Sequence, residues 1–160
     1  EANVTITDPN PVCYPAVIDL TSGNITKGSD TGINITYWKD SLLTKTLSNP
    51  SRIDSSGIFY LKIFTNARCQ IYKVYKVNVV INKAADGIRY ATMETEKYKS
   101  LQLSARNFGT VYTWYPSTGL NNSGIREPLF SYDRDVNYTI NIQDANGCIT
   151  TDSLLVKVKD

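Results

Sequence analysis

The sequence predicts an all-β protein built from two tandem immunoglobulin-like β-sandwich domains. Its clearly periodic stretches alternate with a period of two and are rich in Val, Ile, Thr, Tyr and Phe. Turn-forming residues separate these stretches at short intervals, and the second half of the chain repeats the pattern of the first. Short strands with regular turns are typical of sandwiches, and 11% aromatic residues supply apolar surface for packed cores.

The strands expected in the first half are short and bounded by Gly, Asn, Asp, Ser or Pro. They are Val4–Ile6, Ala16–Leu20, Ile33–Trp38, Ile58–Thr65 and Ile71–Ile81. Within the third of these, Ile33, Ile35 and Tyr37 alternate with the residues at 34, 36 and 38. Residues 66–70 predict a hairpin loop between the last two strands.

The second half has the same pattern of short strands bounded by turn-forming residues. Its expected strands are Arg89–Met93, Leu101–Ala105, Thr110–Trp114, Asn137–Gln143 and Ser153–Val158. Residues 144–147 predict a tight turn, because Asn-Gly tolerates the positive φ that such turns require. A helix over Thr92–Lys99 is the one open alternative, although threonines and a tyrosine favour it poorly.

An internal repeat predicts that the chain is divided into two domains. Residues 59–69 lie over residues 138–148 without a gap, at an offset of 79 (148 − 69). Upstream, Ile35–Trp38 matches Val111–Trp114 at an offset of 76 (114 − 38), which predicts a few extra loop residues in the second copy. We therefore expect one domain over residues 1–83 and a second over 84–160, joined by a short polar segment.

The three cysteines predict one disulfide. Cys13 precedes an early strand and Cys69 precedes the last strand of the same domain, so we expect these two to be bonded, with two buried free thiols as the alternative. Cys148 has no counterpart partner and is expected to be a half-buried free thiol, or to bond a neighbouring module or chain. A disulfide indicates an oxidising compartment.

The two tryptophans occupy matching places in the repeat. Trp38 and Trp114 are therefore expected to anchor the two cores, as aromatic residues do in immunoglobulin-like sandwiches. A sugar-stacking platform is the alternative, and it suits Trp114 better because two tyrosines accompany it. The turn-rich loop that follows is the best candidate contact surface, with an ordinary crossover as the alternative. The candidate contact residues are Tyr112, Trp114, Tyr115, Leu120, Asn121 and Asn122.

Composition argues against several functions. The chain has no histidine, which removes the commonest general base and a favoured zinc ligand, so we expect no enzyme, no metal and no cofactor. A surface Ca²⁺ site using Asp133, Asp135 or Asp144 is the open exception. The net charge of +2 is spread along the chain, which argues against nucleic acid, and no apolar stretch is long enough to span a membrane.

Two strings resemble a known family. They are Tyr112 to Asn121, which reads YTWYPSTGLN, and Tyr138 to Cys148, which contains DANGC. Both are similar to the immunoglobulin- or PKD-like modules of Bacteroidetes surface proteins, and residues 12–16 and 57–69 resemble the companion module. The resemblance implies a module pair of a gliding-motility-associated adhesin exported by the type IX secretion system, just before its C-terminal signal domain.

That resemblance sets the functional expectation. The chain would be a non-catalytic presentation segment of a secreted, outer-membrane-attached adhesin. Its partners would be neighbouring modules of the same protein, surface glycans or the export and anchoring machinery. The alternative is a carbohydrate-binding module pair of a secreted polysaccharide-processing or nutrient-capture protein. The triplets Asp40-Ser41-Leu42 and Asp152-Ser153-Leu154 also resemble the O-glycosylation signal of that phylum.

Overall fold

The computed structural model describes residues 1–66 and 68–160, which form two compact units. Unit 1 comprises Glu1–Asn82 and unit 2 comprises Lys83–Asp160. Their border lies one residue from the expected domain boundary. The described residues contain eleven strands and no helix, so the chain is all-β. In this part of the chain there is accordingly no apolar helix of membrane-spanning length.

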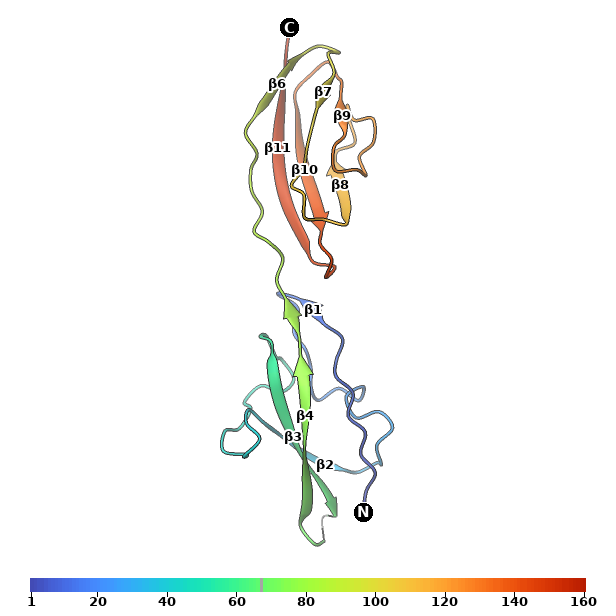
Figure 1. The fold of residues 1–160 in the computed structure, drawn as a ribbon, viewed down its shortest axis with the longest axis vertical. Helices are drawn as coiled ribbons and strands as arrows, with labels where there is room; N and C mark the ends of the chain where they lie inside the picture. Colours follow the sequence, from blue (N-terminus) through green and yellow to red (C-terminus); the bar gives the residue numbers. More distant parts are fainter. Residues whose placement is uncertain (67) are drawn as a thin grey trace. The chain divides into compact units, whose positions relative to one another are not determined.

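Unit 1 contains five strands (Figure 1): β1 Val12–Cys13, β2 Asn34–Trp38, β3 Gly57–Asn66, β4 Ile71–Val79 and β5 Ile81–Asn82. The main sheet is antiparallel in the order β2-β3-β4. On the other side of the core, Ile18 forms an isolated bridge with Ile53. The first strand, β1, runs parallel to the last, β5.

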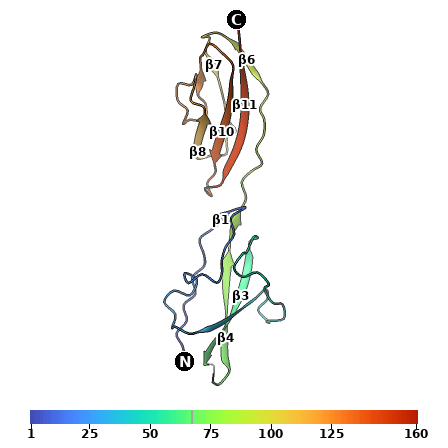
Figure 2. The same ribbon diagram turned by 180° about the vertical axis from the view of Figure 1, so that it is seen from behind.

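Unit 2 contains six strands: β6 Met93–Glu96, β7 Leu101–Gln102, β8 Val111–Tyr115, β9 Leu129–Phe130, β10 Val136–Gln143 and β11 Ile149–Lys159. A four-stranded sheet has the order β6-β11-β10-β8, and Figures 1 and 2 both show β10 between β11 and β8. The second sheet pairs β7 with β9. Here too the first strand is parallel to the last, because β6 pairs with the end of β11.

Each unit follows the immunoglobulin plan. The antiparallel trios β2-β3-β4 and β8-β10-β11 correspond to the C, F and G strands of that fold, with a smaller sheet or bridge opposite. The core of unit 1 includes Leu61, Ile63, Val77 and Val79 from the inner face of the main sheet. The core of unit 2 includes the corresponding inner face of β10 and β11, with Trp114 from β8. Both cores therefore arise from the alternation of buried and exposed side chains along strands.

Several expected elements differ from the structure. Residues 16–20 form only the isolated bridge of Ile18 with Ile53, and residues 101–105 form a strand only over Leu101–Gln102. Residues 4–6 form no strand, although Val4 and Ile6 still pack against the core of unit 1. Residues 89–92 form only an isolated parallel bridge, Arg89 with Ser153. The helix considered over Thr92–Lys99 is absent, and β6 occupies its first half. Its β-branched threonines suit a strand that can pair with β11.

The prediction that Trp38 anchors a core is wrong, because the repeat is one residue out of step at this strand. Leu61 and Ile140 are equivalent core residues, 79 positions apart (140 − 61). Leu61 pairs with Tyr37, whereas Ile140 pairs with Trp114. Tyr37 is therefore the counterpart of Trp114, and Trp38 is the counterpart of Tyr115. A one-residue shift moves a side chain to the opposite face of a sheet, so Trp38 lies on the outer face, half-buried.

Because of this register, the two tryptophans contribute unequally to the stability of the protein. Trp114→Ala should lower the free energy of unfolding by about 3–5 kcal/mol, because it empties a core site. Trp38→Ala should cost about 1 kcal/mol, as for a surface substitution with partial burial. Urea unfolding followed by far-UV circular dichroism measures both. Equal losses would show that Trp38 is a core residue after all.

Candidate functional sites

The residues predicted as a contact surface divide between core and surface. Trp114 is 1% exposed, packs edge-on against Tyr138 at 5.7 Å, and donates its indole N–H to the Ile125 carbonyl at 2.9 Å. Tyr112 is 8% exposed and donates its hydroxyl to the Arg106 carbonyl at 2.8 Å. Of the three aromatic residues, only Tyr115, at 55%, is accessible. A sugar platform on Trp114 and Tyr112 is therefore ruled out in this structure, because neither ring reaches solvent.

The loop after β8 is held by its own polar groups. Leu120 is partly buried and packs against the core of unit 2. Asn121 is exposed, but its Oδ1 accepts the Leu129 N–H at 2.8 Å. Asn122 is also exposed, and its Oδ1 accepts the Gly124 N–H at 2.8 Å. The two asparagine side chains thus shape the loop, and each retains an amide NH₂ for an outside acceptor.

The predicted Cys13–Cys69 disulfide is wrong. Cys69 is a free, exposed thiol, whereas Cys13 and Cys148 are disulfide-bonded. Cys69 lies in the turn before β4, where its N–H bonds to Asn66 Oδ1. Cys13 pairs with Asn82, beyond the other end of β4. The nine residues of β4 separate the two positions by about 30 Å, far beyond disulfide reach.

Thiol labelling checks this assignment. Iodoacetamide added to the unfolded, unreduced chain should modify one cysteine, Cys69, and peptide mass spectrometry should find Cys13 and Cys148 unmodified. After reduction all three should react. Labelling of Cys148 before reduction, or protection of Cys69, would contradict the assignment. Cys69→Ser should leave no reactive thiol and provides the control.

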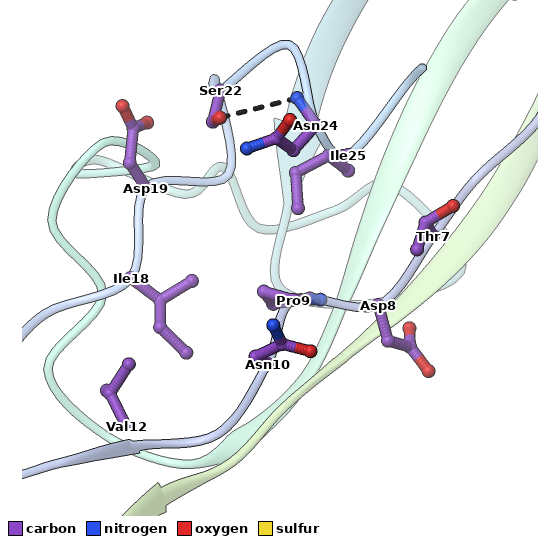
Figure 3. A pocket seen from close by; sticks show the side chains of 10 residues that line it. All are labelled: Thr7, Asp8, Pro9, Asn10, Val12, Ile18, Asp19, Ser22, Asn24 and Ile25. Atoms are coloured by element: carbon purple, nitrogen blue, oxygen red, sulfur yellow. Dashed lines mark hydrogen bonds between the residues drawn. The ribbon is translucent and has the colours of Figure 1, made fainter. Parts of the chain in front are cut away.

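Unit 1 contains a surface recess of about 370 Å³ between its N-terminal segment and the loop at residues 18–25 (Figure 3). Its apolar wall includes Val12, Ile18 and Ile25. Figure 3 shows the carboxyl groups of Asp8 and Asp19 directed away from the other lining side chains. These carboxylates hold backbone: Asp8 accepts the N–H of a β4 residue at 2.9 Å, and Asp19 accepts that of a loop residue at 2.8 Å. The recess is thus bordered by groups that stabilise loops.

The carboxylates considered for Ca²⁺ have separate structural partners. Asp133 pairs with Arg134 at 3.1 Å, Asp135 accepts the Val158 N–H at 2.7 Å, and Asp144 accepts two N–H groups within its own turn. Across residues 1–66 and 68–160, no group of three or more acidic or cysteine side chains is placed to hold a metal ion.

An ionic network that the sequence did not reveal lies in the core of unit 2. Asp152 is 1% exposed and accepts two bonds from the Arg106 guanidinium, at 2.9 and 2.8 Å. It also accepts the Tyr90 hydroxyl at 2.7 Å and the Ile88 N–H at 2.8 Å. The network ties the segment that enters unit 2 to β11. Asp152 and Leu154 of the Asp152-Ser153-Leu154 triplet are therefore buried and Ser153 is half-buried on the opposite face of β11, whereas Ser41 of the first triplet is exposed.

The surroundings of this network set its charges. Burial by itself raises the pKa of the Asp152 carboxyl, but hydrogen bonds from Arg106, Tyr90 and Ile88 outweigh burial and hold the pKa below its ordinary value. Burial, together with the bond to Asp152, raises the pKa of Tyr90 to about 12. The carboxylate is thus ionised and the phenol protonated at neutral pH, which is the combination that the hydrogen bonds require.

Asp152→Asn should destabilise unit 2 by about 3–5 kcal/mol, because it leaves Arg106 without its partner. The wild-type advantage is present above the unfolded pKa of about 4 and is lost as pH falls through the lower native value. Urea unfolding at pH 7 and at pH 3 measures both effects. The matched control is Asp133→Asn, which removes a surface ion pair and should cost much less. Equal costs would show that burial adds nothing to the Asp152 network.

Comparisons with known proteins find structurally similar chains with low sequence identity. No protein-family model matches the sequence, and no curated protein matches it. SGBP-B of the Bacteroides ovatus mixed-linkage glucan utilization locus, solved with a mixed-linkage heptasaccharide, is 17% identical with a TM-score of 0.32. The match covers 100% of this chain and 47% of that one, so the chain spans about half its length.

Two further structures are tandem immunoglobulin modules. DIP-gamma IG1+IG2 is 12% identical over 100% of this chain and 98% of its own, with a TM-score of 0.41. The I9–I11 tandem of titin is 10% identical over 99% and 66%, also with a TM-score of 0.41. These scores are low, so the immunoglobulin-like assignment rests on the strand order and register described above.

Proposed function

We propose that this chain is a non-catalytic presentation segment of a large secreted cell-surface adhesin. The main supporting observation is that Cys13 and Cys148 are disulfide-bonded in a chain of two immunoglobulin-like units. Disulfides persist in extracellular and periplasmic compartments and are rare in the cytosol. An exported, all-β protein of this architecture suits display at the cell surface.

The strand topology supports a presentation role. In both units the segment that enters runs parallel to the strand that leaves, as in Val12 beside Ile81 and Met93 beside Val156. In unit 2 the backbone bonds Tyr90 N–H to Ser153 carbonyl, at 2.8 Å, and Ser153 N–H to Ile88 carbonyl, at 3.0 Å, extend this pairing. Each unit thus holds both of its chain ends in hydrogen-bonded structure, which protects a displayed module against fraying and proteolysis.

The finer assignment, to a gliding-motility-associated adhesin exported by the type IX system and attached to the outer membrane, rests on the motif resemblance. The motif residues have fold-forming roles here. Trp114 and Tyr138 are core residues, and the Tyr138 hydroxyl donates to the Thr118 carbonyl. Asp144 closes the β10–β11 turn, in which Gly147 has φ 81°. The motifs therefore support the same type of module as in those surface proteins. The partners that we propose on this basis are neighbouring modules of the same protein, surface glycans or the anchoring machinery.

Protease accessibility tests the location. In intact cells of the native host, proteinase K should remove the epitope recognised by an antibody against residues 1–160. In cells that lack a type IX secretion component, the epitope should stay protected until the envelope is broken. Protection in both strains would overturn surface display, and accessibility in both would overturn the type IX route alone.

Adhesion is tested in the same host. An in-frame deletion of residues 1–160 should reduce attachment to solid surfaces and gliding speed, while export of the remaining protein continues. Replacement of the segment by an unrelated pair of immunoglobulin-like modules should restore both if presentation is its role. Unchanged attachment and gliding in the deletion strain would contradict the proposal.

A further inference from the structure

The outer face of the main sheet of unit 1 has an unusual composition for a solvent-facing surface. Leu61, Ile63 and Val77 mark the inner face, so the alternate positions of β2, β3 and β4 point outward. We call these positions the aromatic–lysine face. They are Asn34, Thr36, Trp38, Ile58, Tyr60, Lys62, Phe64, Tyr72, Val74, Lys76 and Asn78.

Strand register sets the order of side chains on this face. One cross-strand row contains Trp38, Tyr60 and Lys76, and Lys62 lies in the next row. The four positions from Ile58 to Phe64 on β3 extend over about 20 Å at the ordinary rise of a strand. The face is therefore long enough for a polymer of several repeating units.

The face carries positive charge at its centre. The Lys62 ammonium lies 5.0 Å from the ring centroid of Phe64 and 4.4 Å from that of Tyr72, so both rings hold it in place. Lys76 supplies a second cation, and none of the outward residues of these three strands is acidic. The nearby carboxylate of Asp8, which lines a recess with Lys76, accepts the Asn78 N–H at 2.9 Å. Among the residues described, neither lysine has a carboxylate within ion-pair distance. The charge thus complements an anionic partner.

Two rings of the face remain for stacking. Trp38 and Tyr60 lie side by side across β2 and β3, and both are partly exposed. The indole N–H of Trp38 donates to Thr36 Oγ1 at 2.8 Å, which leans the ring along its own strand. The C–H faces of sugars pack against such rings, and Asn34 and Thr36 offer hydrogen bonds to hydroxyl groups.

The fold does not require this composition. The equivalent outward face of unit 2 has Tyr115 as its one aromatic residue, and its other positions are Val111, Thr113, Asn137, Thr139, Asn141, Gln143, Ile149, Thr151, Ser153, Leu155, Lys157 and Lys159. Tyr115 takes the place of Trp38, and Asn141 that of Lys62. The same architecture therefore forms with a single outward ring, so the four outward rings of unit 1 require a cause beyond folding.

From these features we propose that the aromatic–lysine face binds an anionic polysaccharide, such as a uronic-acid polymer. Sugar rings stack on Trp38 and Tyr60, while the carboxylates pair with Lys62 and Lys76. A protein partner is less suited, because lysine is depleted in the centre of protein interfaces. The disulfide-bonded cysteines favour an extracellular polymer over nucleic acid. The proposal holds whether or not the chain belongs to an adhesin.

Affinity electrophoresis of the 160-residue chain tests it. Polygalacturonate in the gel should retard the chain, and uncharged dextran should not. Lys62→Gln/Lys76→Gln should weaken retardation about tenfold, because two charge-assisted contacts are lost. Trp38→Ala should weaken it to a similar extent through lost stacking. Circular dichroism checks that each variant is folded. If Trp38→Ala does not fold, the variant at half-buried Lys62 and exposed Lys76 provides the test.

Unit 2 supplies the matched controls. Lys157→Gln/Lys159→Gln makes the same change of charge on its outer face, and Tyr115→Ala removes the counterpart of Trp38. Both should leave retardation unchanged. The proposal is overturned if no acidic polysaccharide retards the chain or if the controls lose as much. Equal binding to polyglutamate, or stronger binding to single-stranded oligothymidine, would instead assign the face to acidic protein or to nucleic acid.

Discussion

The alternation of side chains across each main sheet is the constraint on which this structure depends. In each unit, one face of a C-F-G trio provides much of the core, so a residue is buried or exposed according to its parity along the strand. On β3, Leu61 and Ile63 point inward while Tyr60 and Lys62 point outward. The small opposing sheets add little hydrogen bonding, so the units depend on this inner face for their stability.

The mainly apolar inner face of unit 2 contains a charged residue, Asp152. Asp152 pairs with Ile140, at the place where unit 1 has Tyr75 beside Leu61. A buried carboxylate is costly, but four hydrogen bonds from three partners satisfy it here. Because two of those partners, Ile88 and Tyr90, belong to the entering segment, the ion pair also fixes where the chain joins the sheet. Hydrophobic residues could pack this site, but they would not specify that connection.

The sequence predicts the sheets well and the sites poorly, for a physical reason. Period-two alternation is local, so most strands, the all-β class and the core role of Trp114 follow from it. Disulfide partners depend on where strand ends meet. Cys69 lies at one end of β4 and Cys13 beside the other, which the spacing of cysteines along the chain does not show. Asp152 could not be found either, since its partner Arg106 is 46 residues away and has no motif.

For Trp38, the internal repeat gives the wrong prediction, whereas the alternation of side chains along the same strand gives the right one. Aligning Trp38 with Trp114 placed it in a core, whereas the alternation of Ile33, Ile35 and Tyr37 already assigned it to the opposite face. The strand register follows the alternation, because burial of the apolar side chains stabilises the sheet. The sequence match between Trp38 and Trp114 contributes no such stabilisation. Once Trp38 is outward, it joins Tyr60 and the two lysines on a face that is richer in aromatic residues than the outer face of unit 2. Two copies of one fold can thus keep similar inner faces while the residues of their outer faces differ. The difference between the outer faces indicates that the two units contact partners of different chemistry.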